Sequence, residues 1–557
     1  QSSVDYKILI GLGQRVVDSL QIIWPDQLVT RVIKPSLDTL LALSWPETGT
    51  LAVSTNAQQD KPLFESLSVP VFEKHSEDGF IDSYYDLNIP WMISQEGPKA
   101  AVGDVNGDGR EDVYIGGATR QAGQLYLQTP TGFQKISTPD FDRFADFEDA
   151  AVLFFDSDRD GDLDLFVGSG GNNRNPGSRE LHNRLYRNDG KGHFSYDSLA
   201  LPPSNANNGV VATHDFDRDG DQDLFVGSRS LSLNYGPDPE NFLLQNDGKG
   251  HFTDQTSLLA PGLRKVGLVT GAVWSQLAGD ATKELIIVGE WMSPKVFSYQ
   301  QGQFREITTN LAEHTGWWQA LAVHDLDGDG DEDLILGNLG ENFYLQPDKT
   351  HPVKVWMNDF DQNGSLEKII TQTINGKDRP VFLKRELSEQ VIAIKKQNLK
   401  YESYGNKTIQ ELFPGQVLQS CQVKQVTYPS SCIAYNEGGG QFSVQPLPMD
   451  MQWSSLNAFL VMDVNGDKRP DLIAGGNRFN LLPQFCRLDA SYGHVCINTG
   501  DRKWEELPSA RSGILWTGQV RDLGILHRNA QPQLLVLQND RIPVLYQSHF
   551  TTTSRKK

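Results

Sequence analysis

The chain lacks the features that mark membrane-spanning and nucleic-acid-binding proteins. No apolar run among its 557 residues approaches the 18 or more that a membrane span needs. Basic residues number 50 against 71 acidic ones, a net charge of −21, whereas nucleic-acid backbones attract a basic face. No signal peptide is recognisable, and Gln1 has the character of an internal or processed start. We therefore expect any membrane association to depend on another component.

Cysteine is also scarce, with four residues in two close pairs, Cys421 with Cys432 and Cys486 with Cys496. Three connectivities are possible, and the short spacing favours the two local disulfides over the alternative of four reduced thiols. Zinc is disfavoured because neither a CxxC spacing nor a neighbouring histidine pair accompanies the cysteines. Disulfides would indicate a location outside the cytoplasm.

Motifs of common catalytic sites are missing as well. The sequence contains no Gly-x-Ser-x-Gly, no His-Glu-x-x-His and no P-loop, and its 11 histidines are scattered. His193 and His251 occupy the same place in two similar Asp-Gly-Lys-Gly-His-Phe turns, which indicates surface residues of a repeat. We predict that the protein is not an enzyme.

An acidic nine-residue loop is what the chain has in abundance. Its first, third, fifth, seventh and ninth positions are the candidate metal-ligating ones, and position 6 is glycine in every copy except the last, where it is Lys468. The six copies have, at these positions, Asp104, Asn106, Asp108, Arg110 and Asp112; Asp156, Asp158, Asp160, Asp162 and Asp164; Asp215, Asp217, Asp219, Asp221 and Asp223; Asp325, Asp327, Asp329, Asp331 and Asp333; Asp359, Asp361, Asn363, Ser365 and Glu367; Asp463, Asn465, Asp467, Arg469 and Asp471.

These loops are candidate calcium sites. Calcium takes six to eight oxygen ligands in flexible geometry, and positions 1, 3, 5 and 9 offer carboxylate or amide oxygens. Position 7 varies in residue type, which suits a backbone carbonyl ligand. The first, third, fifth and ninth positions of the six loops carry 21 carboxylates, whose mutual repulsion would oppose folding without cations. We therefore predict about six Ca²⁺ ions with a structural role. A solvated acidic turn is the alternative for any single copy.

The loops are not EF-hands, because position 12 is apolar in the four clearest copies and short β-branched runs flank each loop. Each loop therefore links two strands. A second turn follows in patterns such as Asn183–Phe194 and Asn241–Phe252, where Asn-Asp-Gly indicates a hairpin. Four-stranded units begin near residues 100, 151, 210, 271, 320, 456 and 518, and those at 271 and 518 have lost the metal ligands. This predicts an all-β propeller of seven blades, or of eight if the Asp359 loop starts a further unit.

At this point the chain resembles the FG-GAP/VCBS repeat, the calcium-binding blade of integrin α-subunit propellers, over residues 90–547. Residues 10–13 (Ile-Gly-Leu-Gly) and 17–26 resemble the ASPIC/UnbV motif, with Gln27 where that family usually has glycine. The expected domains are an ASPIC/UnbV-like β element (1–54), a propeller (55–547) and a C-terminal tail (548–557). The arrangement is similar to large surface proteins of Bacteroidota, some of which accompany SusC/SusD-type outer-membrane importers, and this implies that the chain is the C-terminal part of a longer protein.

One segment, 376–428, breaks the β pattern. Leu387, Val391, Ile394 and Leu399 have helical spacing, and Thr408 with Glu411 matches a capping box. We predict a helical insertion, which either packs on the edge of a blade or contacts a partner.

The end of the central channel is the usual binding surface of a propeller. Gln95–Glu96, Asn207–Asn208, Thr270, Trp317–Trp318 and Trp516–Thr517 are candidates for its rim. The Trp317–Trp318 pair either binds a peptide or glycan or fills the core, and the core is the better-supported alternative. The predicted function is an extracytoplasmic binding or scaffold component with a protein partner, at the cell surface, in an outer-membrane complex or secreted. The alternatives are a propeller enzyme acting on polysaccharide and a surface adhesin.

Overall fold

The computed structural model describes residues 17–23, 28–44, 50–51, 61–277, 282–482, 485, 487–529 and 531–549. The chain divides into two compact units, Gln1–Pro62 and Leu63–Lys557. The first contains an antiparallel sheet of β1 (Ser19–Ile23), β2 (Leu28–Ile33) and β3 (Thr50–Leu51). The Ile10–Gly13 motif, Trp24–Gln27 and all but the first two residues of the predicted tail lie outside the described residues.

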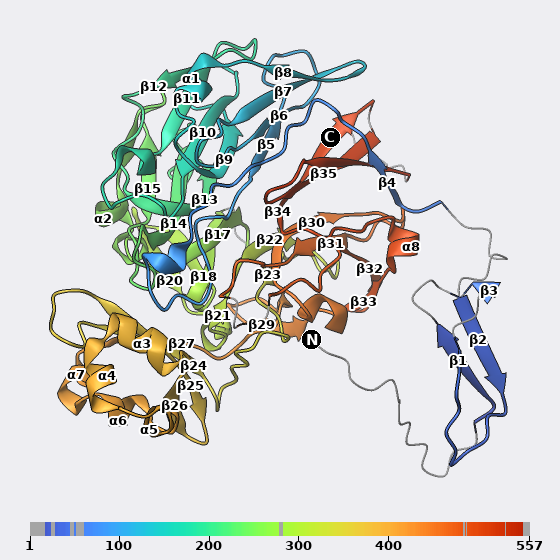
Figure 1. The fold of residues 1–557 in the computed structure, drawn as a ribbon. Helices are drawn as coiled ribbons and strands as arrows, with labels where there is room; N and C mark the ends of the chain where they lie inside the picture. Colours follow the sequence, from blue (N-terminus) through green and yellow to red (C-terminus); the bar gives the residue numbers. More distant parts are fainter. Residues whose placement is uncertain are drawn as a thin grey trace. The chain divides into compact units, whose positions relative to one another are not determined.

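Within its described residues, the second unit is built almost entirely from four-stranded antiparallel sheets (Figure 1). Seven of them repeat one antiparallel plan, in which consecutive strands are neighbours except where β23 pairs with β28 and β36 pairs with β4. The first three are β5–β8 (Ala100–Gly103, Asp112–Ile115, Gln124–Thr129, Gly132–Ile136), β9–β12 (Asp149–Phe155, Asp164–Ser169, Arg184–Asn188, Phe194–Asp197) and β13–β16 (Ala206–His214, Asp223–Leu231, Phe242–Asn246, Phe252–Asp254).

The next three sheets are β17–β20 (Leu268–Ser275, Glu284–Met292, Lys295–Gln300, Gln303–Ile307) with the added β21 (Gly316–Trp317), then β22-β23-β28-β29 (Ala320–His324, Asp333–Gly337, Cys432–Asn436, Phe442–Pro446), and β30–β33 (Leu456–Met462, Asp471–Gly476, His494–Gly500, Lys503–Glu506). The last is β34-β35-β36-β4 (Val520–Arg528, Gln531–Gln538, Val544–Ser548, Phe64–Leu67).

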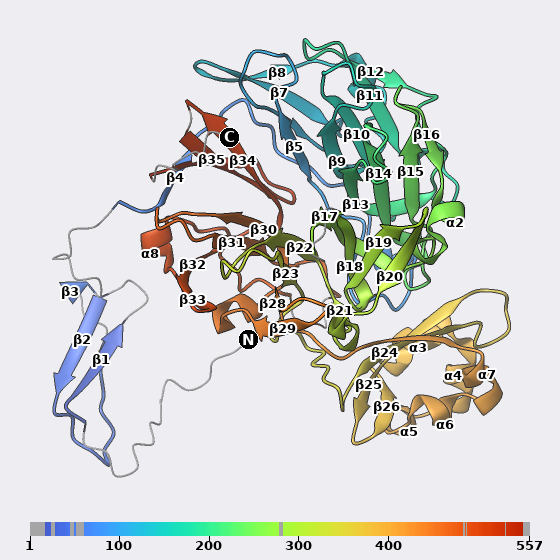
Figure 2. The same cartoon turned by 180° about the vertical axis from the view of Figure 1, so that it is seen from behind.

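The first strands of these sheets contact one another in a closed ring, from β5 through β9, β13, β17, β22, β30 and β34 back to β5. The ring closes through the last sheet, since β4 comes from the start of the unit and pairs with β36, Ser66 opposite Tyr546. Figure 2 shows the same arrangement from behind. The predicted all-β propeller is confirmed.

The hydrophobic core lies between adjacent sheets. Residues 164–169 of β10 and 284–292 of β18 are buried along their whole length, which explains the apolar runs 165–167 and 285–288 within them. Phe166 and Leu185 of one sheet pack with Leu224 and Phe242 of the next. Because the inner strands of the ring sheets are buried in this way, most of the acidic side chains lie in the loops at the strand ends.

A further sheet is inserted between β23 and β28, in the order β26-β25-β24-β27 (Figure 1, gold). Its strands are β24 (Val353–Asn358), β25 (Glu367–Ile374), β26 (Lys377–Pro380) and β27 (Gln422–Val426). Five short helices follow β26, namely α3 (Lys384–Gln390), α4 (Ile392–Gln397), α5 (Tyr401–Gly405), α6 (Ile409–Leu412) and α7 (Gly415–Gln419). The inserted segment thus starts ahead of residue 376, and the Asp359 loop joins its strands β24 and β25.

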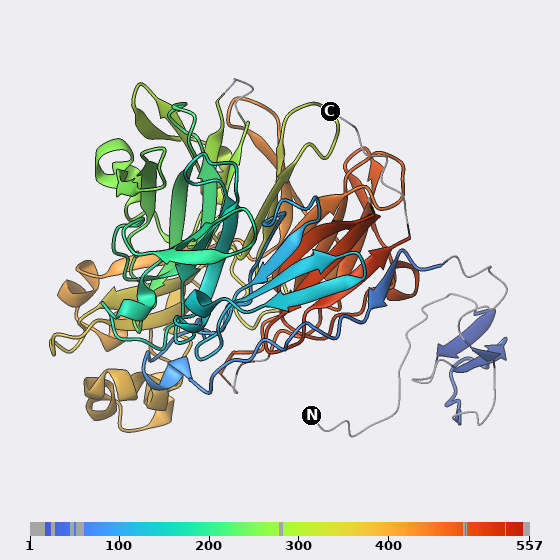
Figure 3. The ribbon, with the colours of Figure 1, turned by 90° about the horizontal axis from the view of Figure 1, so that it is seen from above.

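The insertion has a hydrophobic core of its own, which includes Leu387, Val391 and Ile394 but not Leu399, which is exposed. Thr408 and Glu411 form the predicted capping box of α6. The lobe is seen from above in Figure 3.

The remaining helical turns are short. They are α1 (Pro139–Asp142), α2 (Thr256–Leu259), α8 (Ser509–Ser512) and five 3₁₀ turns at Asp82–Tyr84, Arg179–Leu181, Pro261–Leu263, Asn310–Glu313 and Met449–Gln452. Over the described residues, no helix combines the length and apolar character that crossing a membrane requires.

The predicted disulfides are wrong. Cys421, Cys432 and Cys496 are free thiols, and Cys486 lies outside the described residues. The reason is topological: Cys421 follows α7 in the insertion, whereas Cys432 is in β28 of a ring sheet, buried completely. Cys496, in β32, packs against Met451, 3.3 Å between the two sulfur atoms. Proximity in sequence therefore did not place the members of a pair together.

Candidate metal loops and the centre of the ring

All six predicted loops join the first two strands of a hairpin: β5–β6, β9–β10, β13–β14, β22–β23, β24–β25 and β30–β31. In each one, the carboxylate at position 1 accepts a hydrogen bond from the N–H of position 6, at 2.7–3.2 Å. The five position-6 glycines have φ between 81° and 100°, the left-handed region that glycine tolerates best. Lys468 adopts the same region, with φ of 71°, in the sixth loop.

Position 9 has a structural role that the sequence did not reveal. In five ring loops, one oxygen of this aspartate accepts the N–H of position 2, and the other accepts an N–H from the third strand of the same sheet at 2.7–2.9 Å. The aspartates are Asp112, Asp164, Asp223, Asp333 and Asp471. This residue therefore fixes the loop to the sheet with or without a metal.

The β17–β18 hairpin supports this interpretation, since its loop has lost most of the ligand pattern. Glu284 still stands at position 9, and its carboxylate accepts the N–H of Leu277 at 3.0 Å. The bond from position 2 to position 9 thus persists where the other acidic positions have changed.

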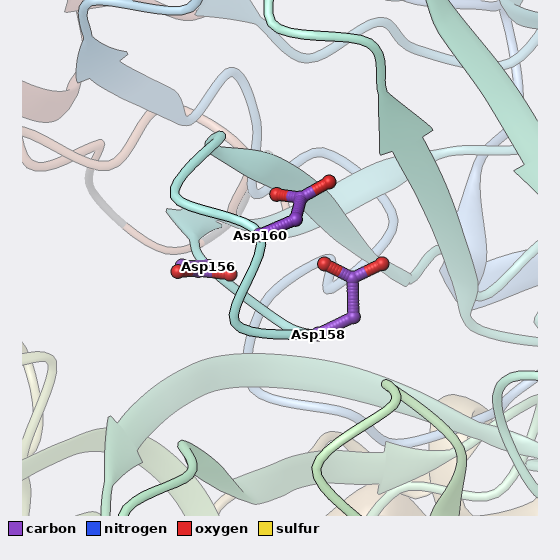
Figure 4. Close-up of side chains that lie close together, drawn as sticks. All are labelled: Asp156, Asp158 and Asp160. Atoms are coloured by element: carbon purple, nitrogen blue, oxygen red, sulfur yellow. The ribbon is translucent and has the colours of Figure 1, made fainter.

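Four loops bring three carboxylates together, with ligand oxygens within 4.8 Å of one another. Three unite positions 1, 3 and 9: Asp215, Asp217 and Asp223; Asp325, Asp327 and Asp333; Asp359, Asp361 and Glu367. In the fourth, Asp156, Asp158 and Asp160 project from the turn between β9 and β10 (Figure 4). Of the remaining acidic positions, Asp221 pairs with Arg159, and the distance from Arg159 Nη2 to Asp221 Oδ2 is 3.2 Å. Other predicted side chains lie outside these three-carboxylate groups, namely Asp162, Asp219, Asp329, Asp331, Asn363 and Ser365.

The loops at Asp104 and Asp463 differ, because asparagine replaces aspartate at position 3. Arg110 and Arg469 at position 7 donate to Asp108 and Asp467, and each Nε also donates to a carbonyl of the third strand, Gln128 O at 3.0 Å and Asn498 O at 2.7 Å. The guanidinium groups are therefore engaged within the loop, and only the backbone carbonyl of position 7 remains for a metal, as the sequence suggested.

The residues fit calcium. Four buried carboxylate oxygens in the three-carboxylate loops have no hydrogen-bond partner: Asp158 Oδ1, Asp221 Oδ1, Asp361 Oδ1 and Glu367 Oε1. Oxygen atoms from carboxylates, amides and backbone carbonyls are the ligand set that Ca²⁺ prefers. Burial raises the pKa of Asp223 to about 8 and the pKa of Asp333 to about 6, which expresses how poorly these sites hold negative charge without a cation.

The comparisons with known proteins agree with this geometry. The model of the FG-GAP-like repeat matches residues 104–167, 156–226 and 276–336, and the model described as ASPIC and UnbV matches residues 1–50. The chain carries FG-GAP-like repeats. It also carries an ASPIC and UnbV segment at its start. No curated protein matches the chain in sequence.

Solved structures with related folds are distant. The V. cholerae biofilm matrix protein Bap1 is 11% identical, covers 88% of this chain and 91% of its own, and gives a TM-score of 0.36. The Dos1 propeller is 10% identical, with 84% and 96% covered and a TM-score of 0.35. YCF48 bound to D1 peptide is 7% identical, with 88% and 98% covered and a TM-score of 0.41.

Neighbouring sheets of the ring are joined to one another by a recurrent asparagine near the end of the third strand. Its side-chain amide donates to the carbonyl of position 2 in the preceding loop, at 2.7–3.0 Å: Asn188 to Val105, Asn246 to Ser157, Asn436 to Leu277 and Asn498 to Leu326. The Asn-Asp-Gly pattern contained this signal, but it was interpreted only as a turn. Metal loop, anchor aspartate and neighbouring sheet thus form one connected unit.

The centre of the ring is occupied by the chain itself. The segment between β4 and β5 buries Ile89, Trp91 and Ile93 in one cluster with Trp291 and Trp317. Trp317 and Trp318 are fully buried, so the alternative that they fill the core is the correct one, and they offer no face to a glycan or peptide. Asn207, Asn208 and Trp516 are buried too, and Thr270 donates to the carbonyl of Trp318 at 2.7 Å.

Glu96, carried by the same segment, receives three arginines from distant parts of the ring. Arg229, Arg478 and Arg521 approach its carboxylate at 2.9, 2.7 and 3.1 Å. Burial alone would raise the pKa of Glu96, but the three positive charges together hold that pKa well below its usual value. Glu96 therefore stays ionised and fully paired.

A second carboxylate completes this network. Glu290 pairs with Arg229, accepts the Tyr235 hydroxyl at 2.6 Å, and accepts the Gln319 amide at 3.0 Å. The side-chain oxygen of Gln319, Oε1, in turn accepts a hydrogen bond from the Arg478 guanidinium at 2.6 Å. This polar cluster occurs once and does not repeat around the ring, and its acids are paired with the protein's own groups.

Proposed function

We propose that this protein is a non-catalytic, calcium-stabilised β-propeller that acts as an extracytoplasmic binding scaffold. The observation that carries the proposal is the repetition of the acidic loops. They recur between the first two strands of several sheets and contain buried carboxylate oxygens with no hydrogen-bond partner. Repetition of this kind serves the architecture, whereas catalysis needs a single set of groups.

In this proposal the loop carboxylates hold the ion, and the bound ion supplies positive charge to the hairpin. Asp215, Asp217 and Asp223 illustrate the arrangement, because their oxygens already converge while the Asp223 anchor fixes the loop to the third strand. Binding to the folded state alone would stabilise it by mass action.

The paired state of the central acids supports a non-catalytic role. A general acid must release a proton, and a general base or nucleophile must reach a substrate. Glu96 is held ionised by three arginines, and Glu290 is completely buried. Neither meets those requirements in this conformation.

The scaffold's partner is proposed from resemblance. We infer a protein partner in an outer-membrane complex of the SusC/SusD importer type, as in Bacteroidota surface proteins with similar repeats. A calcium-dependent fold suits compartments in which free calcium is plentiful.

Co-purification from detergent-solubilised membranes tests the scaffold role directly. The tagged chain, expressed in its source cells, is expected to retain one partner in a fixed ratio in the presence of calcium. A variant with substitutions on an exposed turn, such as Lys191→Glu, serves as the control. Recovery of the chain alone under these conditions would contradict the proposal, and recovery of a processed polysaccharide would favour the enzyme.

A further inference from the structure

The helical part of the insertion presents a surface unlike the rest of the molecule. Leu383, Ile392, Leu399 and Tyr401 are exposed by 59%, 61%, 86% and 62%. The insertion does not need them for folding, because it already buries a core of nine residues that includes Leu387, Val391 and Ile394. These four exposed side chains therefore lie outside the hydrophobic core of the lobe, and their exposure needs an explanation other than folding.

Helix α4 is divided between these two environments. Val391, Ile394 and Asn398 face inward and are buried, whereas Ile392, Lys395, Lys396 and Leu399 are exposed. Within α4, Ile392, Lys395 and Lys396 have spacings of three and four, which places them on one side of the helix, and Leu399 follows the end of the helix at Gln397. An apolar and basic face thus points away from the protein.

Lys384 connects this face to the neighbouring exposed residues. Its ammonium group donates to the carbonyl of Leu399 at 3.1 Å and lies 5.1 Å from the centre of the Tyr401 ring. The start of α3, with Leu383, is thereby held beside the turn that carries Leu399, Lys400 and Tyr401. We call this surface, made of Leu383, Ile392, Lys395, Lys396, Leu399, Lys400 and Tyr401, the insertion patch.

The charge of the patch region is opposite to that of the chain. Residues 383–407 contain six basic and three acidic residues, a net charge of +3, within a chain of net charge −21. Of the acids, Glu389 is paired with Arg385, 3.3 Å from Nε to Oε1, and Glu402 lies on α5. Three lysines, Lys395, Lys396 and Lys400, flank the exposed leucine and isoleucine with no ion pair among the described residues.

We propose that the insertion patch docks onto an anionic lipid surface. Single apolar side chains that project between lysines suit the boundary of headgroups and acyl chains, where the apolar tips enter and the ammonium groups meet phosphate. A protein partner is disfavoured, because lysine is depleted from the centres of protein interfaces. The inference goes beyond the proposed function and rests on it only in placing the protein beside a membrane.

Vesicle co-sedimentation of the full calcium-loaded chain tests the proposal. Vesicles containing phosphatidylglycerol are expected to bind the protein, with binding weakened at high salt, and vesicles of phosphatidylcholine alone are not. The triple variant Lys395→Glu, Lys396→Glu, Lys400→Glu should lower the affinity on the order of tenfold or more, and Ile392→Ser with Leu399→Ser should abolish binding.

Matched control variants are available in turns and on the short helix α2, outside the insertion. Leu199 and Leu258 are exposed by 80% and 67%, so Leu199→Ser with Leu258→Ser repeats the apolar change, and Lys191→Glu, Lys249→Glu, Lys265→Glu repeats the charge change. Both controls are expected to bind vesicles as the wild type does.

Absence of wild-type binding, or equal binding by patch and control variants, would overturn the proposal. Concentration-dependent dimerisation that is lost in the Ile392→Ser, Leu399→Ser variant would instead assign the patch to a second copy. These results are separable from failure of the scaffold role, because vesicle binding is measured on the isolated folded chain, whereas the co-purification measures a partner.

Discussion

The outer loops and the centre of the ring both concentrate carboxylates, but they neutralise them in different ways. At the centre, Glu96 and Glu290 are surrounded by Arg229, Arg478 and Arg521. In the loops with three converging carboxylates, buried oxygens such as Asp158 Oδ1 and Asp361 Oδ1 have no partner. The centre therefore supplies its own cations, whereas the loops leave carboxylate oxygens unpaired, and we propose that cations from solution bind them.

The two regions therefore depend on their surroundings in different ways. A buried ion pair formed by the chain persists at any metal concentration, while a site filled from solution stabilises in proportion to the logarithm of free ion. The two regions are therefore expected to respond independently to chelation, substitution and pH, which gives experimental ways to separate them.

Chelation should have the largest effect. Removing calcium with EDTA leaves the loop carboxylates to repel one another, and several sites lost together should lower the thermal unfolding midpoint by about 10 °C or more. Scanning calorimetry with and without added Ca²⁺ measures this. Magnesium serves as the control, because it demands a smaller octahedral site and should restore less stability. An unchanged midpoint in EDTA would remove the distinction between the loops and the centre.

The centre should respond to substitution of its own acid. Glu96→Gln removes the charge that three buried arginines share, and loss of one partner from such a buried group costs about 3–5 kcal/mol. Urea unfolding measures the loss, which we expect to be the same with and without calcium. Glu505→Gln is the matched control, since that side chain is 62% exposed. A Glu96→Gln effect that disappeared in EDTA would mean that the two regions are not independent.

The loops could be predicted from sequence because each is a short local pattern that recurs. Repetition also predicted the hairpins and the all-β ring, since every unit reports the same spacing. The central network could not be predicted, because Glu96 and Arg521 are 425 residues apart and neither belongs to a repeated sequence pattern. No repeat or local period links them.

The wrong disulfides have a related cause. Cys421 and Cys432 are close in sequence, but an inserted sheet separates them, and its boundaries were not visible in the helical pattern alone. The anchor role of Asp223 was missed for another reason, because a carboxylate that accepts two N–H groups has the same spacing as one that binds metal.

A buried histidine beside the turn between β35 and β36 must remain uncharged in the folded chain. Burial lowers the pKa of His75 to about 4 from an ordinary value of 6.5, so the unfolded chain takes up a proton first as the pH falls. Its contribution is complete above pH 6.5 and is lost progressively between 6.5 and 4, about 2 kcal/mol by pH 5.

Substituting His75 should therefore flatten part of the acid response of the chain. His75→Gln is expected to reduce the fall in the free energy of unfolding between pH 7 and pH 5, measured by urea unfolding at each pH. The exposed His193 provides the control, as His193→Gln should leave the slope unchanged. Identical slopes for wild type and His75→Gln would show that this histidine is not buried in its neutral form.

An effect smaller than that of Glu96→Gln should come from the neutral hydrogen bonds beside the metal loops. Asn246→Ala removes the bond from its amide to the carbonyl of Ser157, 2.8 Å long and buried between two sheets, together with the support of Gly250 N–H. We expect the free energy of unfolding to fall by about 1–3 kcal/mol, because a buried carbonyl is left without its donor. The exposed Asn342 is the control for the same substitution.

The same substitution should weaken calcium binding, because the bond from Asn246 fixes the loop that carries Asp156 and Asp158. Titration calorimetry measures this change in affinity. A variant with unaltered calcium affinity would show that the metal loops, unlike the central network, act independently of the sheets beside them.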